Sequence, residues 1–172
     1  KSRELGPQSL NHLRGFLSRA FGAARRAGRW VGPNPVVEVR KRRVPRRPPQ
    51  FLREREVPLL FDALAPRWRP LFATAIYTGL RKGELLGLRK SAVDLDARLL
   101  AVVRSYARDT TKGGHGAVLP IAEELVPYLR AALAASPSEL VFPRADGSMM
   151  RPDVDLENVL RRALGRAGVV LG

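Results

Sequence analysis

The sequence between residues 78 and 88 reads Thr78-Gly79-Leu80-Arg81-Lys82-Gly83-Glu84-Leu85-Leu86-Gly87-Leu88. Gly79 follows an apolar helical pattern over residues 68–76 and is typical of a helix C-terminus. Arg81 then stands where a second helix, expected around residues 82–88, begins, and the amide groups at a helix start favour anions. Glu84 lies three residues further along, where it can orient the guanidinium. The stretch therefore predicts a phosphate-binding arginine between two helices.

The rest of the chain after residue 50 alternates between helical and extended patterns. Upstream of the quoted stretch, apolar spacing predicts a helix over residues 57–64. Downstream, three strands are predicted, with a tight turn at 96–98, from Val93 and Leu95, Leu99 to Arg104, and Ala117 to Ile121. Helical spacing returns over residues 125–133 and 156–164, and Pro152 is expected at the first position of the last helix. The fold class is therefore mainly helical α+β, with a small three-stranded antiparallel sheet.

The loop between the second and third strands, residues 105–116, contains Lys112 followed by Gly113 and Gly114. A lysine on a glycine-flanked hairpin tip can reach into a groove. A nucleotide-binding loop is excluded, because the lysine precedes the glycines and no Ser or Thr follows to hold magnesium. Taken singly, an arginine after a glycine is more often a solvated helix terminus, and a lysine in a glycine turn is usually turn chemistry. A function is favoured because the arginine stretch, the strands and the lysine loop follow one another in this order along the chain.

The first 50 residues form a different region. Residues 9–27 have an amphipathic helical pattern that ends at Gly28, with Arg14 and Arg25 on the polar face. Residues 32–35 break this helix, and residues 40–50, rich in proline and like charge, are predicted to be an extended linker. The polar face and the linker are expected to lie along a phosphate backbone, although a solvated helix face and a flexible tether with incidental charge are the alternatives.

The overall charge also favours a polyanion partner. The chain has 172 residues, with 31 Lys plus Arg against 16 Asp plus Glu, and 26 of those cations are Arg. Residues 1–56 contain 15 basic and 4 acidic residues, so most of the excess lies at one end. Guanidinium groups match phosphate oxygens, which favours a nucleic acid. A general preference for Arg over Lys is the alternative reading of the composition, but it does not explain the clustering.

Several classes of protein are excluded. The chain has no cysteine and two histidines, which makes a disulfide framework or a zinc or iron site improbable. No apolar run approaches the roughly 18 to 20 residues that span a bilayer, and the first residues lack the apolar segment of a signal peptide. A soluble cytosolic protein with no membrane partner is expected.

In this order of elements the chain resembles the tyrosine recombinases, also called phage integrases. The stretch from Thr78 to Leu88 resembles the first arginine box of that family, and the helices, box, sheet and lysine-bearing hairpin are similar to its catalytic domain. The resemblance implies that residues 1–39 are the C-terminal part of a helical core-binding domain, that residues 40–50 are a basic linker, and that residues 51–172 are the first part of the catalytic domain.

The resemblance also implies roles for individual residues. Arg81 would bind non-bridging oxygens of the scissile phosphate with Glu84 in support, and Lys112 would protonate the departing 5′ oxygen. The reaction would use no metal or cofactor, would pass through a 3′-phosphotyrosyl intermediate and would serve DNA integration or recombination. The partners would be double-stranded DNA and further copies of the full-length protein, as a tetramer on the nucleoid. The expected DNA-binding residues are Arg14, Arg25, Arg40, Lys41, Arg42, Arg43, Arg46 and Arg47.

The sequence also departs from the family pattern. The second box, His-x-x-Arg, is absent, because neither His12 nor His115 has an arginine three residues later. Tyr77, Tyr106 and Tyr128 all precede the place of the nucleophilic tyrosine, and packing is the favoured role for Tyr77 and Tyr128. We therefore expect an internal piece of a longer recombinase that binds DNA without cleaving it. The alternative is a non-catalytic basic nucleic-acid-binding module or a degenerate integrase-derived regulator, in which Arg81 and Lys112 have no special role.

Overall fold

The computed structural model describes residues 5–45, 48, 50–102 and 116–170. The chain divides into two units, Lys1–Pro49 and Gln50–Gly172. In the described residues of the first unit there is one long helix, and those of the second unit form the sheet and the remaining helices.

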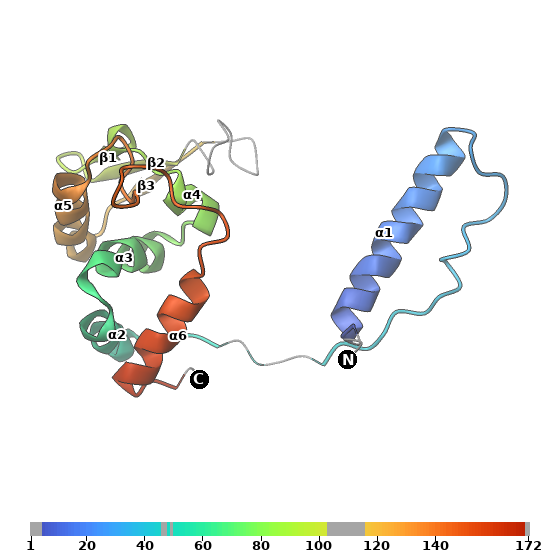
Figure 1. The fold of residues 1–172 in the computed structure, drawn as a ribbon, viewed down its shortest axis with the longest axis horizontal. Helices are drawn as coiled ribbons and strands as arrows, with labels where there is room; N and C mark the ends of the chain where they lie inside the picture. Colours follow the sequence, from blue (N-terminus) through green and yellow to red (C-terminus); the bar gives the residue numbers. More distant parts are fainter. Residues whose placement is uncertain (1–4, 46–47, 49, 103–115, 171–172) are drawn as a thin grey trace. The chain divides into compact units, whose positions relative to one another are not determined.

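The second unit is built mainly from helices. They are α2 (Val57–Ala63), α3 (Arg69–Thr78), α4 (Lys82–Leu86), α5 (Val126–Ala135) and α6 (Leu156–Ala167). Short 3-10 turns occur at Glu54–Glu56, Pro66–Trp68, Lys90–Ala92 and Glu123–Leu125. Helix α3 packs against α5, and α2 packs against α6, so that α3 lies between the sheet layer and the α2–α6 pair (Figure 1).

The three predicted strands form one antiparallel sheet. They are β1 (Val93–Asp94), β2 (Leu99–Val102) and β3 (Ala117–Pro120), in the order β1-β2-β3. The β2–β3 register pairs Leu100 with Leu119 and Val102 with Ala117. In the β1–β2 turn the Asp94 carboxylate accepts a hydrogen bond from the Ala97 amide at 2.8 Å. The predicted fold class, mainly helical α+β with this sheet, is confirmed.

A single apolar core joins the helices to the sheet. Its largest fully buried apolar members are Leu60, Leu64, Leu71, Leu86, Leu100, Leu125, Leu129 and Val141. Burying each such side chain contributes about 1.5–3 kcal/mol. Because α4 supplies both Leu85 and Leu86 to this core, the start of α4 is held firmly against the rest of the unit.

The start of the last helix differs from the prediction. Pro152 does not occupy its first position, because α6 begins at Leu156. Asp155 caps the helix instead, and its carboxylate accepts a hydrogen bond from the Asn158 amide at 2.8 Å. A carboxylate that accepts from a helix amide otherwise without a partner stabilises a helix start by about 0.5–2 kcal/mol.

The first unit consists of α1 (Pro7–Arg26) and the chain that follows it. After Gly28, at φ 66°, the chain turns and runs back beside α1 (Figure 1). The described residues of the predicted linker, 40–45, 48 and 50, lie in no helix or strand, and Arg42 among them is hydrogen bonded to Asn11 of α1. Polar side chains of α1 hold this part by its backbone, which a reading based on proline and charge content could not anticipate.

Candidate functional site

Arg81 lies in the short connection between α3 and α4. Gly79 ends α3 in the left-handed conformation, at φ 66°, which glycine adopts without steric cost. Leu80 is buried, and Arg81 is extended, at φ −67° and ψ 152°, as the residue before α4. The predicted break between two helices is therefore observed, and it places the exposed Arg81 directly after the buried Leu80.

Glu84 fixes Arg81 through both its backbone and its side chain. One carboxylate oxygen accepts a hydrogen bond from the Arg81 amide at 2.8 Å. The other accepts one from the Arg81 guanidinium Nη1 at 3.1 Å. The Glu84 side chain is only 7% exposed, whereas that of Arg81 is 71% exposed. A buried carboxylate thus orients a guanidinium that faces solvent.

This arrangement differs in one respect from the sequence-based expectation. The Arg81 amide, which was expected to favour an anion, already donates to Glu84. The α4 helix also spans only five residues, so its dipole is small. Any anion binding at this point therefore depends on the guanidinium, whose remaining N–H groups form a planar fork that matches phosphate oxygens.

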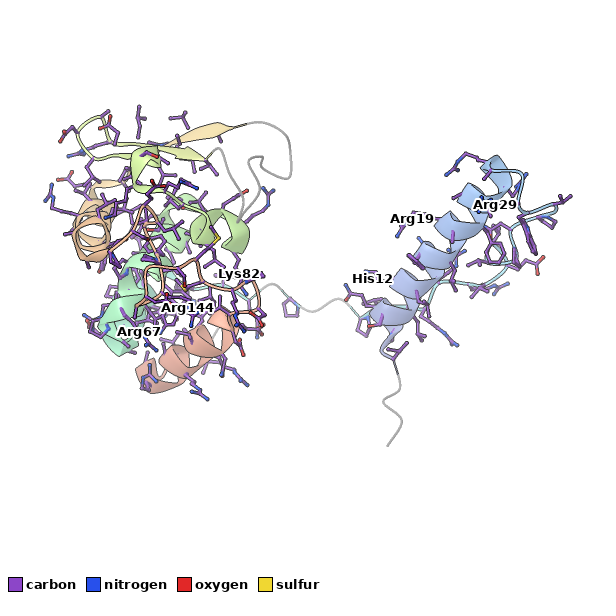
Figure 2. All side chains as sticks on the ribbon, turned by 45° about the horizontal axis from the view of Figure 1, so that its top comes forward. His12, Arg19, Arg29, Arg67, Lys82 and Arg144 are labelled. Carbon is purple, nitrogen blue, oxygen red and sulfur yellow. The ribbon has the colours of Figure 1, made fainter. Side chains whose placement is uncertain are left out.

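Lys82, which is also exposed, ties α4 to a distant segment. Its Nζ donates a hydrogen bond to the Val154 carbonyl at 2.5 Å, across 72 residues of sequence. Lys82 is labelled on the second unit in Figure 2. Sequence reasoning missed this residue, because its partner is a backbone carbonyl and no side-chain pattern signals it.

A cavity of about 270 Å³ lies beside Glu84. It is lined by Glu84, Gly87, Leu88, Arg89, Ser91, Ala92, Ala101 and Val102. The lining joins α4 to the last residues of β2, where the loop predicted to carry the hairpin lysine begins. The arginine box and the root of that hairpin are thus on neighbouring elements.

Some predicted residues lie outside the described part of the chain. They are Lys112, Arg46, Arg47, Tyr106 and His115. The structure therefore brings Arg81 and Glu84 together, as expected. The predicted convergence of Lys112 on the same site stays a prediction.

Tyr77 and Tyr128 are both placed in the packed helical part. The rings of Tyr128 and Phe61 have centroids 5.1 Å apart. Tyr77 is 37% exposed at the end of α3, and burial, followed by the negative charge of Glu124, raises its pKa above the usual value. The Tyr128 contact agrees with the packing role expected for that residue. The packing role expected for the exposed Tyr77 stays a prediction.

The described basic residues that were predicted to bind DNA differ in their exposure to solvent. Arg25, Arg40, Lys41, Arg42 and Arg43 are exposed. The partly buried Arg14 guanidinium donates instead to the backbone carbonyls of Val37 and Val39. The apolar side of α1 is also open, and no residue of this fully described helix is buried.

The described residues contain neither a metal-binding cluster nor a membrane-spanning helix. No three His, Asp or Glu side chains in these parts of the chain are grouped closely enough to hold a metal ion. None of the helices that the structure describes has the length and apolar character needed to cross a membrane.

Curated relatives share sequence along most of the chain. Tyrosine recombinase XerA of Thermococcus kodakarensis is 32% identical over 177 residues, which covers 93% of this chain and 60% of the relative. Tyrosine recombinase XerC of Xanthomonas campestris pv. campestris is 29% identical over 163 residues, with 90% of this chain and 48% of the relative covered. The chain thus spans about half to three-fifths of these relatives.

Solved structures show the same fold. A lambda integrase dimer bound to a COC′ core site matches with a TM-score of 0.73 at 20% identity, covering 95% of this chain and 47% of that one. The Tn1549 transposon integrase in complex with a circular intermediate DNA matches with a TM-score of 0.78 at 17% identity, covering 94% and 59%. The profile of the phage integrase family matches residues 50–171, the unit that contains Arg81 and Glu84. The chain therefore belongs to the phage integrase family.

Proposed function

We propose that this chain acts in site-specific DNA recombination as the phosphate-binding part of a tyrosine recombinase. The observation that carries the proposal is the exposed Arg81 guanidinium, which the buried Glu84 carboxylate orients within a family-matched unit. A fixed fork of donors suits the transition state of phosphoryl transfer, in which negative charge gathers on non-bridging oxygens.

Duplex DNA is the proposed partner. The net charge of +15 and the exposed basic residues Arg40 to Arg43 favour a polyanion. Among the matching structures, the lambda integrase dimer is bound to a core site and the Tn1549 integrase is in complex with a circular intermediate DNA. Self-association of the full-length protein on DNA, as a tetramer, is part of the same proposal.

The proposed reaction needs no metal. Arg81 would bind two oxygens of the scissile phosphate while a tyrosine attacks phosphorus, forming a 3′-phosphotyrosyl bond and releasing the 5′ oxygen. Lys112 would give its proton to that oxygen, since an alkoxide is a poor leaving group. Reversal of the same step rejoins the strand, because the covalent intermediate preserves the bond energy.

The 172-residue chain by itself is proposed to bind DNA without cleaving it. Its sequence contains no His-x-x-Arg, so the second arginine of the family pattern is missing from these residues. Tyr77 and Tyr128 lie on the helices α3 and α5, and both precede the place of the family's nucleophile in the sequence. A single oriented guanidinium without a suitable nucleophile is insufficient for strand cleavage.

The first experiment measures binding of the chain to a fluorescent duplex across a range of salt concentrations. Four to six phosphate contacts give a slope of log K against log[salt] of about −4 to −5. A duplex with a nick opposite a candidate site tests covalent capture in parallel. Binding that ignores salt, or capture of the nicked strand by this chain, contradicts the proposal.

The second experiment separates a recombinase from a non-catalytic binding module. In a longer chain that includes a His-x-x-Arg box and a late tyrosine, Arg81→Ala should abolish cleavage and leave DNA binding largely intact. Arg81→Lys is the matched control, because it keeps the charge and loses the bidentate fork. A binding module or degenerate regulator has no cleavage to lose.

A further inference from the structure

Asn11 on α1 is hydrogen bonded in both directions to the backbone of a single residue far along the chain. Its Nδ2 donates to the Arg42 carbonyl at 2.8 Å, and its Oδ1 accepts from the Arg42 amide at 2.8 Å. A side-chain amide that uses both its donor and its acceptor in this way imitates a neighbouring strand. The backbone of Arg42 is therefore fixed although it lies in no helix or strand.

Two further residues on the same face of α1 hold the preceding chain. Arg14 donates from Nη2 to the Val37 carbonyl at 3.3 Å and from Nε to the Val39 carbonyl. Ser18 accepts hydrogen bonds from the Asn34 side chain at its carbonyl and at its hydroxyl, both at 3.1 Å. Positions 11, 14 and 18 are spaced so that they share one helix face.

These contacts act on a segment that would otherwise resist order. Arg40, Lys41, Arg42 and Arg43, here called the basic segment, are four adjacent cations, and all four are exposed. Like charges in close succession repel one another and favour an extended, changing conformation. Within the basic segment, Asn11 holds the backbone of Arg42 and leaves its guanidinium exposed.

We propose that Asn11 and Arg14 are positioning residues that hold the basic segment in the conformation that binds DNA phosphates. The inference rests on the proposed DNA binding and adds a role for α1 in it. It also reassigns Arg14, which the sequence analysis expected to contact DNA itself. A segment that is already ordered loses less conformational entropy when it binds, so it binds more tightly.

The test compares Asn11→Ala with His12→Ala in the full 172-residue chain, using a fluorescent duplex across a salt series. His12 is the adjacent exposed residue and is labelled on α1 in Figure 2, so it is a matched control. Asn11→Ala should weaken binding about five-fold at every salt concentration, which is the net worth of one to two exposed hydrogen bonds. The slope against log[salt] should stay the same, because no cation is removed.

A direct readout of order accompanies the affinity. Amide exchange at Arg42, followed by nuclear magnetic resonance, should accelerate in Asn11→Ala while the amides of α1 stay as protected as in the wild type. Arg42→Ala should instead lower the salt slope by about one, since it removes a phosphate contact. If Asn11 only stabilised α1, Asn11→Ala would also accelerate amide exchange within α1.

Arg14→Gln provides an independent variant in case Asn11→Ala reduces the helical circular dichroism. A positioning role predicts weaker binding with an unchanged slope, whereas direct phosphate contact predicts a slope smaller by about one. The inference is overturned if Asn11→Ala binds like His12→Ala, or if Arg14→Gln lowers the slope. Failure of the wild type to bind the duplex would overturn the proposed function instead, so the two failures are distinguishable.

Discussion

Glu84 should be one of the most costly polar residues to remove from the second unit. Its buried carboxylate accepts one hydrogen bond from the Arg81 amide and one from the Arg81 guanidinium. Glu84→Ala removes both acceptors at a position where the side chain is only 7% exposed. The start of α4 then has no partner for the Arg81 amide, and the guanidinium loses its orientation.

The size of the effect follows from these contacts. A hydrogen bond to a charged group contributes about 1.5–3 kcal/mol, whereas an ion pair with an exposed partner adds about 0–1 kcal/mol. The expected loss in the free energy of unfolding is therefore about 2–3 kcal/mol. Glu84→Gln keeps the shape and one acceptor, so it should cost about half as much.

Urea unfolding followed by Trp68 fluorescence measures this loss. Trp30→Phe serves as the background, because Trp30 belongs to the first unit and would add its own signal. With an m-value of about 2 kcal/mol/M, the midpoint should fall by about 1–1.5 M in Glu84→Ala. A midpoint shift below about 0.25 M, or equal shifts for both variants, would refute the reasoning.

Three other predictions concern the same unit. The Arg166 guanidinium donates to the Ala63 carbonyl at 2.7 and 3.2 Å and so joins α6 to α2. Arg166→Ala should therefore destabilise the unit by about 1–2 kcal/mol in thermal unfolding, with Arg162→Ala as the control. Asp155→Ala should cost about 1 kcal/mol in urea unfolding, whereas Asp155→Asn should cost much less, because both Asp and Asn cap helices. The raised pKa of Tyr77 means that the folded state holds its proton more tightly than the unfolded state, so stability should fall as pH rises above about 10, and Tyr77→Phe should fall less steeply.

The fold of the second unit was largely readable from local signals. Gly79 marks the end of α3, and the observed helix ends at Thr78. The alternation in residues 93–121 predicted three strands and the turn at residues 96–98, because extended segments with one buried face repeat every two residues. Arg81 and Glu84 were found because their spacing places them on one helical turn.

The missed features all depend on contacts between distant residues and the backbone. Asn11 and Arg14 bind carbonyl and amide groups of the returning chain, and Lys82 binds the Val154 carbonyl. Every residue offers the same backbone groups, so the sequence contains no complementary pattern to search for. The misplaced start of α6 has another cause, since Pro152 and Asp155 are both acceptable start signals and the local capping bond decided between them.

Arg81 and Lys82 are adjacent in the chain, but their side chains make different contacts. The Arg81 guanidinium is paired with Glu84 and is largely exposed, whereas the Lys82 ammonium donates to the Val154 carbonyl. A double variant that exchanges them, Arg81→Lys with Lys82→Arg, has the same mass, isoelectric point and amino-acid content as the parent. It would nevertheless place an ammonium at position 81, where the parent has a planar guanidinium. It would also place the bulkier guanidinium at position 82, next to the Val154 carbonyl. Alignments that score the two cations as interchangeable at these columns would therefore group together proteins with different chemistry.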